Sequence, residues 1–181
     1  MDFKAVLSML IKKFEKSNTH YALMGGFALG LWGVGRATVD IDFLISRKDM
    51  EMADRIMLET GYKRKYRSDN VSQYVSPLQV FGEVDFLHAF REASLEMLER
   101  AEEKEIFNGL LKIKVLKPED LIGLKLQAIK NDPERMENDM ADVKALIAVY
   151  EKKLDWSLIE RYFQLFDMKD EYDKLLKEKG R

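Results

Sequence analysis

The sequence predicts an α/β fold of the α+β type, in which helices and strands alternate before helices alone continue. Short runs in the middle of the chain alternate apolar and polar residues, as strands do, and the stretches between them repeat apolar residues at helical spacing. From Pro118 onward only the helical spacing remains. Because the pattern changes near Lys117, we expect a core over residues 1–116 and a helical region over residues 117–181 that packs on this core.

The N-terminal part is expected to form a helix, a strand, a short helix, a strand and a second long helix, over residues 3–16, 20–24, 27–32, 37–45 and 48–60. Apolar residues at helical spacing, with lysines between them, support the first helix. Gly25-Gly26 suits a tight turn between the first strand and the short helix, which Gly33 ends. Ser46 is expected to cap the second long helix, and Gly61 to end it.

The rest of the chain is expected to form strands over 62–67, 71–75 and 79–87, a helix over 90–101, paired strands over 104–107 and 110–115, and helices over 118–130, 134–150, 156–166 and 169–179. Asn108-Gly109 favours a tight hairpin turn between the paired strands. Pro118 suits the first turn of a helix, where its missing N–H leaves no hydrogen bond unmade.

The composition limits the classes of function. The 181 residues are 46% apolar, which is enough for a sizeable core, and the net charge of −2 predicts no strong overall attraction to nucleic acid or membranes. The absence of cysteine excludes disulfides and thiolate metal sites, and it fits the reducing cytoplasm, where we expect the protein. The N-terminal residues lack the order of a signal peptide, and no apolar run reaches the length of a membrane span.

Two carboxylates lie one residue apart inside the apolar strand expected over 37–45. Strand side chains alternate between faces, so Val39, Ile41 and Phe43 can point into a core. Asp40 and Asp42 then share the other face, roughly 6.5–7 Å apart along the strand. Like charges placed this way repel each other unless a cation lies between them, and carboxylate oxygens are ligands that Mg²⁺ prefers.

A third carboxylate, Asp85, lies in a second apolar strand. Val84 and Phe86 alternate with it, so Asp85 faces away from them, and Glu83 on the same face is a possible substitute. Two strands that each offer acid on one face can converge as a three-carboxylate cluster.

These motifs resemble the DNA polymerase β-type nucleotidyltransferase superfamily over residues 20–87. The matching positions are Gly25-Gly26, then Arg36, Thr38, Asp40 and Asp42, then Asp85. The stretches 117–129 and 135–142 resemble a narrower branch, the AbiEii-type nucleotidyltransferases, some of which are toxins of toxin–antitoxin pairs. The resemblance implies a mixed, mostly antiparallel sheet flanked by helices, followed by a C-terminal helical part.

The resemblance also implies roles for these residues. Asp40, Asp42 and Asp85 would be catalytic and would hold Mg²⁺ (or Mn²⁺), with Asp85 completing the nucleophile-side metal. Gly25, Gly26, Arg36 and Thr38 would bind the nucleoside triphosphate. Lys125, and with it Asp139 and Asp142, would face the nucleotide from the helical region, although the two acids also fit an ordinary solvated helix face.

The expected activity is transfer of a nucleoside monophosphate from a nucleoside triphosphate to an acceptor hydroxyl. The acceptor stays open among an RNA 3′ end, a protein side chain and a small molecule such as an aminoglycoside. A cognate antitoxin or other partner protein is expected if the toxin-like branch applies, and no membrane partner is expected. The alternative is a catalytically silent protein of the same fold that acts as a binding or antitoxin partner.

Overall fold

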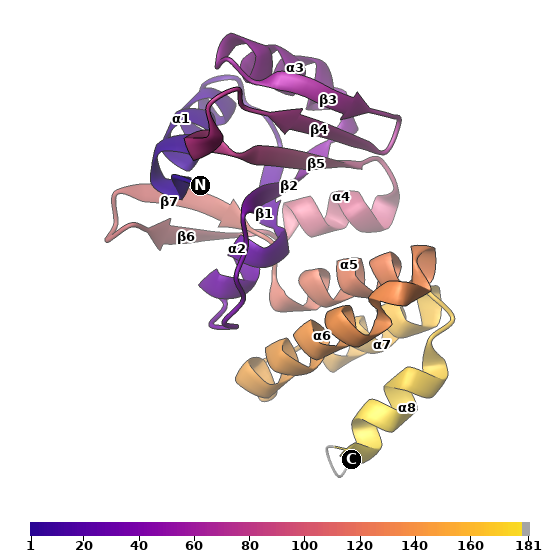
Figure 1. Ribbon diagram of the computed structural model, residues 1–181. Helices are drawn as coiled ribbons and strands as arrows, with labels where there is room; N and C mark the ends of the chain where they lie inside the picture. The colour runs from indigo at the N-terminus through magenta and orange to yellow at the C-terminus, as the bar shows by residue number, and fades with distance from the viewer. Residues whose placement is uncertain (179–181) are drawn as a thin grey trace. The chain divides into compact units, whose positions relative to one another are not determined.

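A computed structural model describes residues 1–178 (Figure 1). The chain forms two compact units. The first unit contains Met1–Gly30 and Arg36–Lys117, and the second contains Leu31–Gly35 and the residues from Pro118 onward.

The first unit contains both strands and helices. In chain order its elements are α1 (Phe3–Lys16), β1 (Tyr21–Met24), α2 (Gly25–Leu31), β2 (Asp40–Ser46), α3 (Met50–Glu59), β3 (Lys63–Arg67), β4 (Val71–Val75), β5 (Glu83–Ala89), α4 (Glu92–Glu99), β6 (Glu102–Ile106) and β7 (Leu111–Val115). Within the described residues, seven strands form one sheet in the order β3-β4-β5-β2-β1-β7-β6. Pairs β2–β5 and β1–β7 are parallel and the other pairs are antiparallel, which confirms the predicted mixed, mostly antiparallel sheet.

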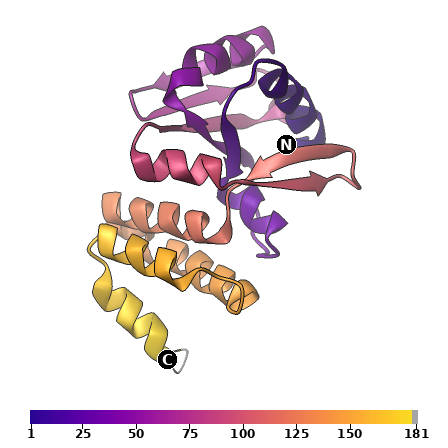
Figure 2. The same ribbon diagram turned by 180° about the vertical axis from the view of Figure 1, so that it is seen from behind.

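The core of the first unit lies between the sheet and the pair α1 and α3. Figure 1 views the opposite face of the sheet, with α1 and α3 behind it, and Figure 2 shows the same helices from behind. The Phe43 and Phe86 rings stack at a centroid distance of 5.7 Å, and the Phe14 ring of α1 meets Phe43 edge-on, also at 5.7 Å. Because strand side chains alternate between faces, the residues on either side of Phe43 and Phe86 in β2 and β5 point to the face away from α1.

The second unit is helical. It contains α5 (Pro118–Asn131), α6 (Met136–Tyr150), α7 (Trp156–Leu165) and α8 (Lys169–Glu178), with α5 against α6 and α7. The buried Tyr162 hydroxyl of α7 donates a hydrogen bond of 2.6 Å to Asp120 of α5. The segment Leu31–Gly35 joins this unit, where the Trp32 ring packs edge-on against Tyr150 at 5.4 Å.

Several predictions about element boundaries were wrong. Val39 is 79% exposed and does not enter the core, because β2 begins only at Asp40. Ser46 makes no side-chain capping bond, since a short 3₁₀ turn over Arg47–Asp49 precedes α3. The strand expected over 79–87 starts at Glu83, after a 3₁₀ turn and a glycine with φ of +60°. Lys179, the last residue of the expected final helix, lies outside the described residues.

None of the helices within residues 1–178 is long and apolar enough to cross a membrane.

Candidate active site

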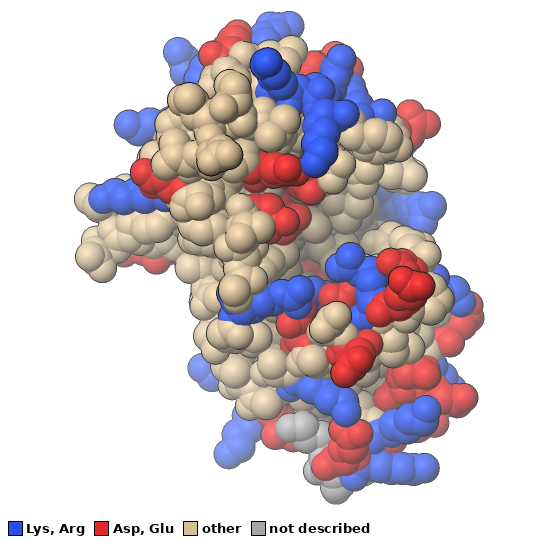
Figure 3. Space-filling view, viewed as in Figure 1, with Lys and Arg blue, Asp and Glu red and all other residues tan. Residues whose placement is uncertain are grey.

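The parallel pairing of β2 with β5 brings the predicted acidic residues together. Asp42 is the direct partner of Asp85 in this pairing, and Asp40 is the partner of Glu83. Direct partners on neighbouring strands share a face and lie about 5 Å apart. The sheet therefore presents four carboxylates on the face opposite α1, because the residues between them are buried on the other face. Figure 3 shows acidic side chains gathered over β5, with basic side chains over β3 and β4 beside them.

Asp85 is half-buried and is contacted from β4. Its Oδ2 accepts a hydrogen bond of 3.1 Å from the Gln73 side chain on β4. Its Oδ1 is buried and has no hydrogen-bond partner within residues 1–178. Burial raises the pKa of Asp85 above its ordinary value, although the bond from Gln73 opposes this effect. The negative charges of Asp40 and Glu83 raise the same pKa further.

Asp40 is held by the residue two positions before it. The Thr38 hydroxyl donates a hydrogen bond of 2.6 Å to Asp40 Oδ1. Gly26 leaves the space that Thr38 occupies, because a Cβ built on Gly26 would lie 2.7 Å from Thr38 Cβ. Thr38 therefore lies between Gly26 and Asp40 and is close to both.

Gly25 stands in the same relation to Asp42. Its φ of +68° is one that residues with a side chain rarely adopt. A Cβ at this position would collide with the Asp42 carboxylate and would lie 2.6 Å from Asp42 Cγ. Because Gly25 and Gly26 have no side chains, Asp42 and Thr38 can lie close to the backbone of α2.

The carboxylates do not form a closed metal cage. Within residues 1–178, no group of three or more His, Asp or Glu side chains is arranged to hold a metal ion. The three-carboxylate cluster predicted from the sequence is present only as the direct pair Asp42–Asp85 with Asp40 on the same face.

Arg36 is exposed and begins the segment that leads through Thr38 into β2. Arg36 is thus close to Asp40 in the sequence, and its contact with a nucleotide stays a prediction.

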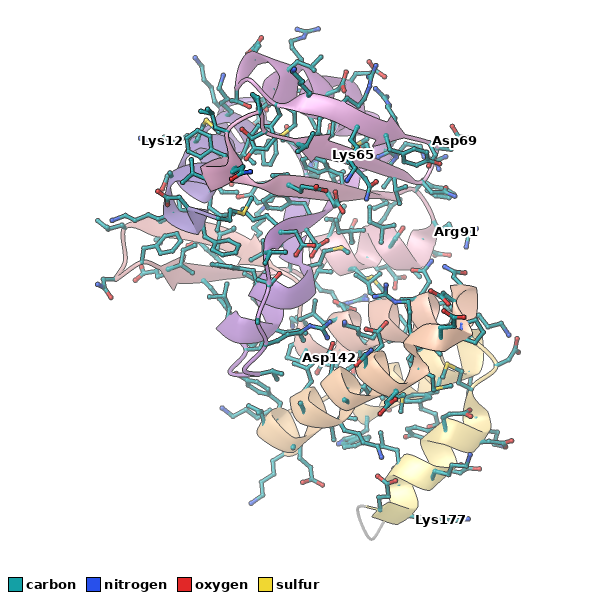
Figure 4. All side chains as sticks on the ribbon, viewed as in Figure 1. Lys12, Lys65, Asp69, Arg91, Asp142 and Lys177 are labelled. Atoms are coloured by element: carbon teal, nitrogen blue, oxygen red, sulfur yellow. The ribbon has the colours of Figure 1, made fainter. Side chains whose placement is uncertain are left out.

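The predicted residues of the helical unit also meet one another. Lys125 of α5 contacts both Asp139 at 2.7 Å and Asp142 at 2.6 Å on α6, and Arg135 contacts Asp139 at 2.8 Å. Figure 4 labels Asp142 on α6. Both acids are buried, so the solvated-face interpretation was wrong. Burial alone would raise the pKa of Asp139, but hydrogen bonds from Lys125 and Arg135 outweigh it and lower this pKa.

Sequence reasoning did not identify two neighbours of the carboxylates, Gln73 and Lys65. Gln73 contacts Asp85, and Lys65 forms an ion pair of 3.1 Å with Glu83. The position of Gln73 between Val71 and Val75 on one face of β4 was a signal, but its meaning depends on the pairing of β4 with β5.

Comparisons with known structures agree with this fold. The antibiotic-resistance factor ANT(2'')-Ia matches with a TM-score of 0.66 and 15% identity, covering 99% of each chain. The lincosamide antibiotic adenylyltransferase LnuA matches with a TM-score of 0.57 and 14% identity, covering 81% of this chain and 97% of that one. An antigenic nucleotidyltransferase-like protein from Paracoccidioides brasiliensis matches with a TM-score of 0.58 and 19% identity, covering 96% and 91%.

No curated protein sequence matches the chain. The AbiEii-type branch is not distinguished by these comparisons and stays a prediction. Residues 3–176 match a family described as uncharacterised nucleotidyltransferase, which includes both compact units. The chain therefore belongs to this nucleotidyltransferase family, within the polymerase β-like superfamily that its motifs predict.

Proposed function

We propose that the protein transfers a nucleoside monophosphate from a nucleoside triphosphate to an acceptor hydroxyl in a metal-dependent reaction. The observation that carries this proposal is the direct pairing of Asp42 with Asp85, with Asp40 on the same face of the sheet. Like charges at this spacing repel one another, so the arrangement costs stability unless a cation binds between them. Charged groups that lower the stability of the fold in this way are typical of functional sites.

The residues present suit a hard divalent cation. Asp40, Asp42 and Asp85 would hold Mg²⁺ (or Mn²⁺), because their oxygen atoms are the ligands such ions prefer. The buried and unpartnered Oδ1 of Asp85 fits this role, since a cation would supply the partner it lacks. An incomplete cage also fits, because Mg²⁺ is commonly held by one or two carboxylates together with water and substrate phosphates.

In the proposed reaction, the acceptor oxygen forms a bond to the α-phosphorus as the bond from that phosphorus to pyrophosphate breaks. The acceptor proton leaves to solvent. When bound, the metal would neutralise the phosphate charge and lower the pKa of the acceptor hydroxyl. Asp85 would orient the acceptor side of the site, and Thr38 would hold the Asp40 carboxylate in place.

Two groups of residues support the nucleotide in this proposal. Gly25 and Gly26 leave the backbone of α2 close to Asp42 and Thr38, where a triphosphate could approach. Arg36 would add a positive charge for the phosphates. The ion pairs of Lys125 with Asp139 and Asp142 account for the burial of these two acids. The contact of the three residues with a nucleotide stays a prediction.

The test is incubation of the purified protein with Mg²⁺ and each α-labelled nucleoside triphosphate, together with total cellular RNA, protein and an aminoglycoside. We expect label in one acceptor fraction with the unsubstituted protein and none with Asp42→Asn. The matched control is Asp69→Asn, because Asp69 is exposed between β3 and β4 and its backbone carbonyl, which the substitution keeps, accepts a hydrogen bond from His88.

Full transfer by Asp42→Asn would contradict the assignment of this carboxylate. Absence of label in every fraction, combined with Mg²⁺-dependent nucleotide binding, would support the alternative of a silent binding protein. Such a result would leave a toxin or antitoxin role open to tests of a partner protein.

A further inference from the structure

The edge strand β3 carries an irregularity beside the carboxylates. Its register with β4 shifts between Arg64 and Tyr66, so Lys65 is the extra residue of a β-bulge. Arg64 lies on the α3 side of the sheet, where its guanidinium pairs with Asp54 at 3.1 Å. Arg67 also pairs with acids of α3, at 2.6 Å from Glu51. Two of the four basic residues of β3 are therefore used to hold α3.

The bulge directs the residues between these arginines to the carboxylate face. The Lys65 ammonium group donates hydrogen bonds of 3.2 and 3.1 Å to the two carboxylate oxygens of Glu83. Glu83 lies on the same face of β5 as Asp85. Figure 4 labels Lys65 at the β3 and β4 side of the sheet. Tyr66 is the direct partner of Gln73, which is in turn the direct partner of Asp85. A regular strand would place only one of two consecutive side chains on this face.

Tyr66, Gln73, Asp85 and Asp42 thus form one row across four neighbouring strands. With about 4.8 Å between strands, the Tyr66 backbone lies roughly 10 Å from that of Asp85.

The side chains at the β3 end of the row are exposed. All five residues of β3 are exposed, with Tyr66 at 51%, and within residues 1–178 the Tyr66 side chain has no ring, hydrogen-bond or ionic partner. Four of the five are basic in a chain whose net charge is −2. Lys63, the partner of Val75, lies on the same face as Lys65 by strand alternation. An exposed aromatic ring beside cations is a combination that binds single-stranded nucleic acid.

The position of the row also indicates which substrate lies there. The glycines Gly25 and Gly26 approach the acidic strand from β1, on the other side of Asp42 from β4. In the proposed function these glycines lie on the nucleotide side, and Asp85 lies on the nucleophile side. Since attack on the α-phosphorus is in line, the acceptor approaches from the side opposite to the leaving pyrophosphate. That side is the surface of β4 and β3.

We propose that Lys65 and Tyr66 form a subsite for the terminal nucleotide of a single-stranded RNA acceptor, with Tyr66 stacking on the base and Lys65 and Lys63 contacting phosphate. This inference rests on the proposed function and names the acceptor class that the proposal leaves open. A polycationic aminoglycoside is disfavoured at this subsite, because Lys63 repels it and Lys65 already neutralises Glu83.

The first experiment measures binding of a fluorescein-labelled single-stranded RNA of about twelve nucleotides by fluorescence anisotropy. We expect Tyr66→Ala and Lys65→Gln each to weaken binding about tenfold. Lys65→Gln should also reduce the slope of log Kd against log salt by about one phosphate contact, whereas Tyr66→Ala should leave the slope unchanged.

Two variants serve as matched controls. Tyr66→Phe keeps the ring and should bind RNA as the unsubstituted protein does. Lys12→Gln removes one exposed lysine from α1, on the other face of the sheet, and should change neither affinity nor slope by a comparable amount. Unchanged unfolding midpoints for all variants are expected, since the substituted side chains are exposed. Equal RNA affinity of Tyr66→Ala and the unsubstituted protein would overturn the subsite.

The second experiment separates this proposal from the proposed function. Asp42→Asn should still bind the RNA, so loss of transfer and loss of acceptor binding are independent readouts. Transfer to the RNA 3′ end that is lost in Tyr66→Ala, with the KM for the nucleotide unchanged, supports the subsite. Transfer to an aminoglycoside such as tobramycin or to a protein side chain, with no competition by RNA, would overturn it while the transferase activity stands. RNA binding that depends on Tyr66, without transfer to any acceptor, would uphold the surface and contradict the proposed function.

Discussion

The backbone at Gly25 lies so close to the Asp42 carboxylate that no side chain can be accommodated between them. Asp42 is at once the neighbour of this glycine, the partner of Met24 in β1 and the partner of Asp85 in β5. Position 25 therefore controls the orientation of one member of the paired carboxylates. Substitution of Gly25 is therefore expected to lower the activity more than it lowers the stability of the protein.

Gly25→Ala is expected to lower transfer at least 100-fold, because the new Cβ must displace the Asp42 carboxylate from its place beside Asp85. The positive φ adds a stability cost of about 1–3 kcal/mol. The measurement is kcat/KM together with urea unfolding at pH 7.

Gly61→Ala is the matched control for this substitution. Gly61 has a φ of +87°, but a Cβ there would meet no atom within 4 Å. It should therefore show a similar backbone strain with near-normal activity. Equal loss of activity in both variants would mean that strain, and not the displaced carboxylate, inactivates Gly25→Ala.

Thr38→Val is expected to reduce kcat about tenfold, because it removes the hydroxyl that donates to Asp40. Thr38→Ser keeps this donor and should retain most of the activity. Thr38 acts on the reaction through Asp40, so the Mg²⁺ concentration for half-maximal rate should rise in Thr38→Val and stay unchanged in Thr38→Ser. A larger loss in the serine variant would contradict this positioning role.

Asp85→Asn is expected to abolish transfer and yet to stabilise the metal-free protein by a few degrees in its unfolding midpoint. The physical reason is that burial and the charges of Asp40 and Glu83 raise the pKa of Asp85 in the folded state. A raised folded pKa means that ionisation above it costs stability, so the gain should be present near neutral pH and should vanish below the ordinary carboxyl range.

The control for the charge change is Asp173→Asn, at an exposed position of α8. It should shift neither the midpoint nor its pH dependence. Addition of Mg²⁺ should raise the midpoint of the unsubstituted protein and leave that of Asp85→Asn nearly unchanged. The same response to Mg²⁺ in both proteins would contradict a metal role for Asp85.

The alternation within single strands made much of the candidate site predictable. Ile41 and Phe43 are buried while Asp40 and Asp42 share the other face, as period-two alternation requires. The prediction failed for Val39, where alternation was extended beyond the true start of the strand. Strand ends depend on where pairing with the neighbouring strand stops, and a local pattern carries no information about that.

Relations between distant segments were the part that local patterns could not supply. The direct pairing of Asp42 with Asp85 requires the parallel register of β2 and β5, which depends on contacts far apart in the chain. The bulge at Lys65 reverses the face expected from alternation, and a strand of four basic residues and Tyr66 gives no apolar and polar alternation that would show it. Burial of Asp139 and Asp142 was likewise missed, because it depends on Lys125 of α5, which meets both acids only where α5 packs against α6.

Lys125→Met is expected to destabilise the protein by about 3–5 kcal/mol, because it leaves Asp139 and Asp142 buried without their shared cation. The matched control is Lys130→Met on the same helix, where the ion pair of Lys130 with the exposed Asp167 should be worth no more than about 1 kcal/mol.

The effect of Lys125→Met should depend on pH. Because Lys125 and Arg135 lower the pKa of Asp139 in the folded state, their stabilisation is present above the ordinary carboxyl pKa and is lost as the pH falls through the lowered value. Urea unfolding between neutral and acidic pH should therefore converge for the two variants at low pH, and equal stabilities at pH 7 would show that the buried ion pairs contribute no more than a surface pair.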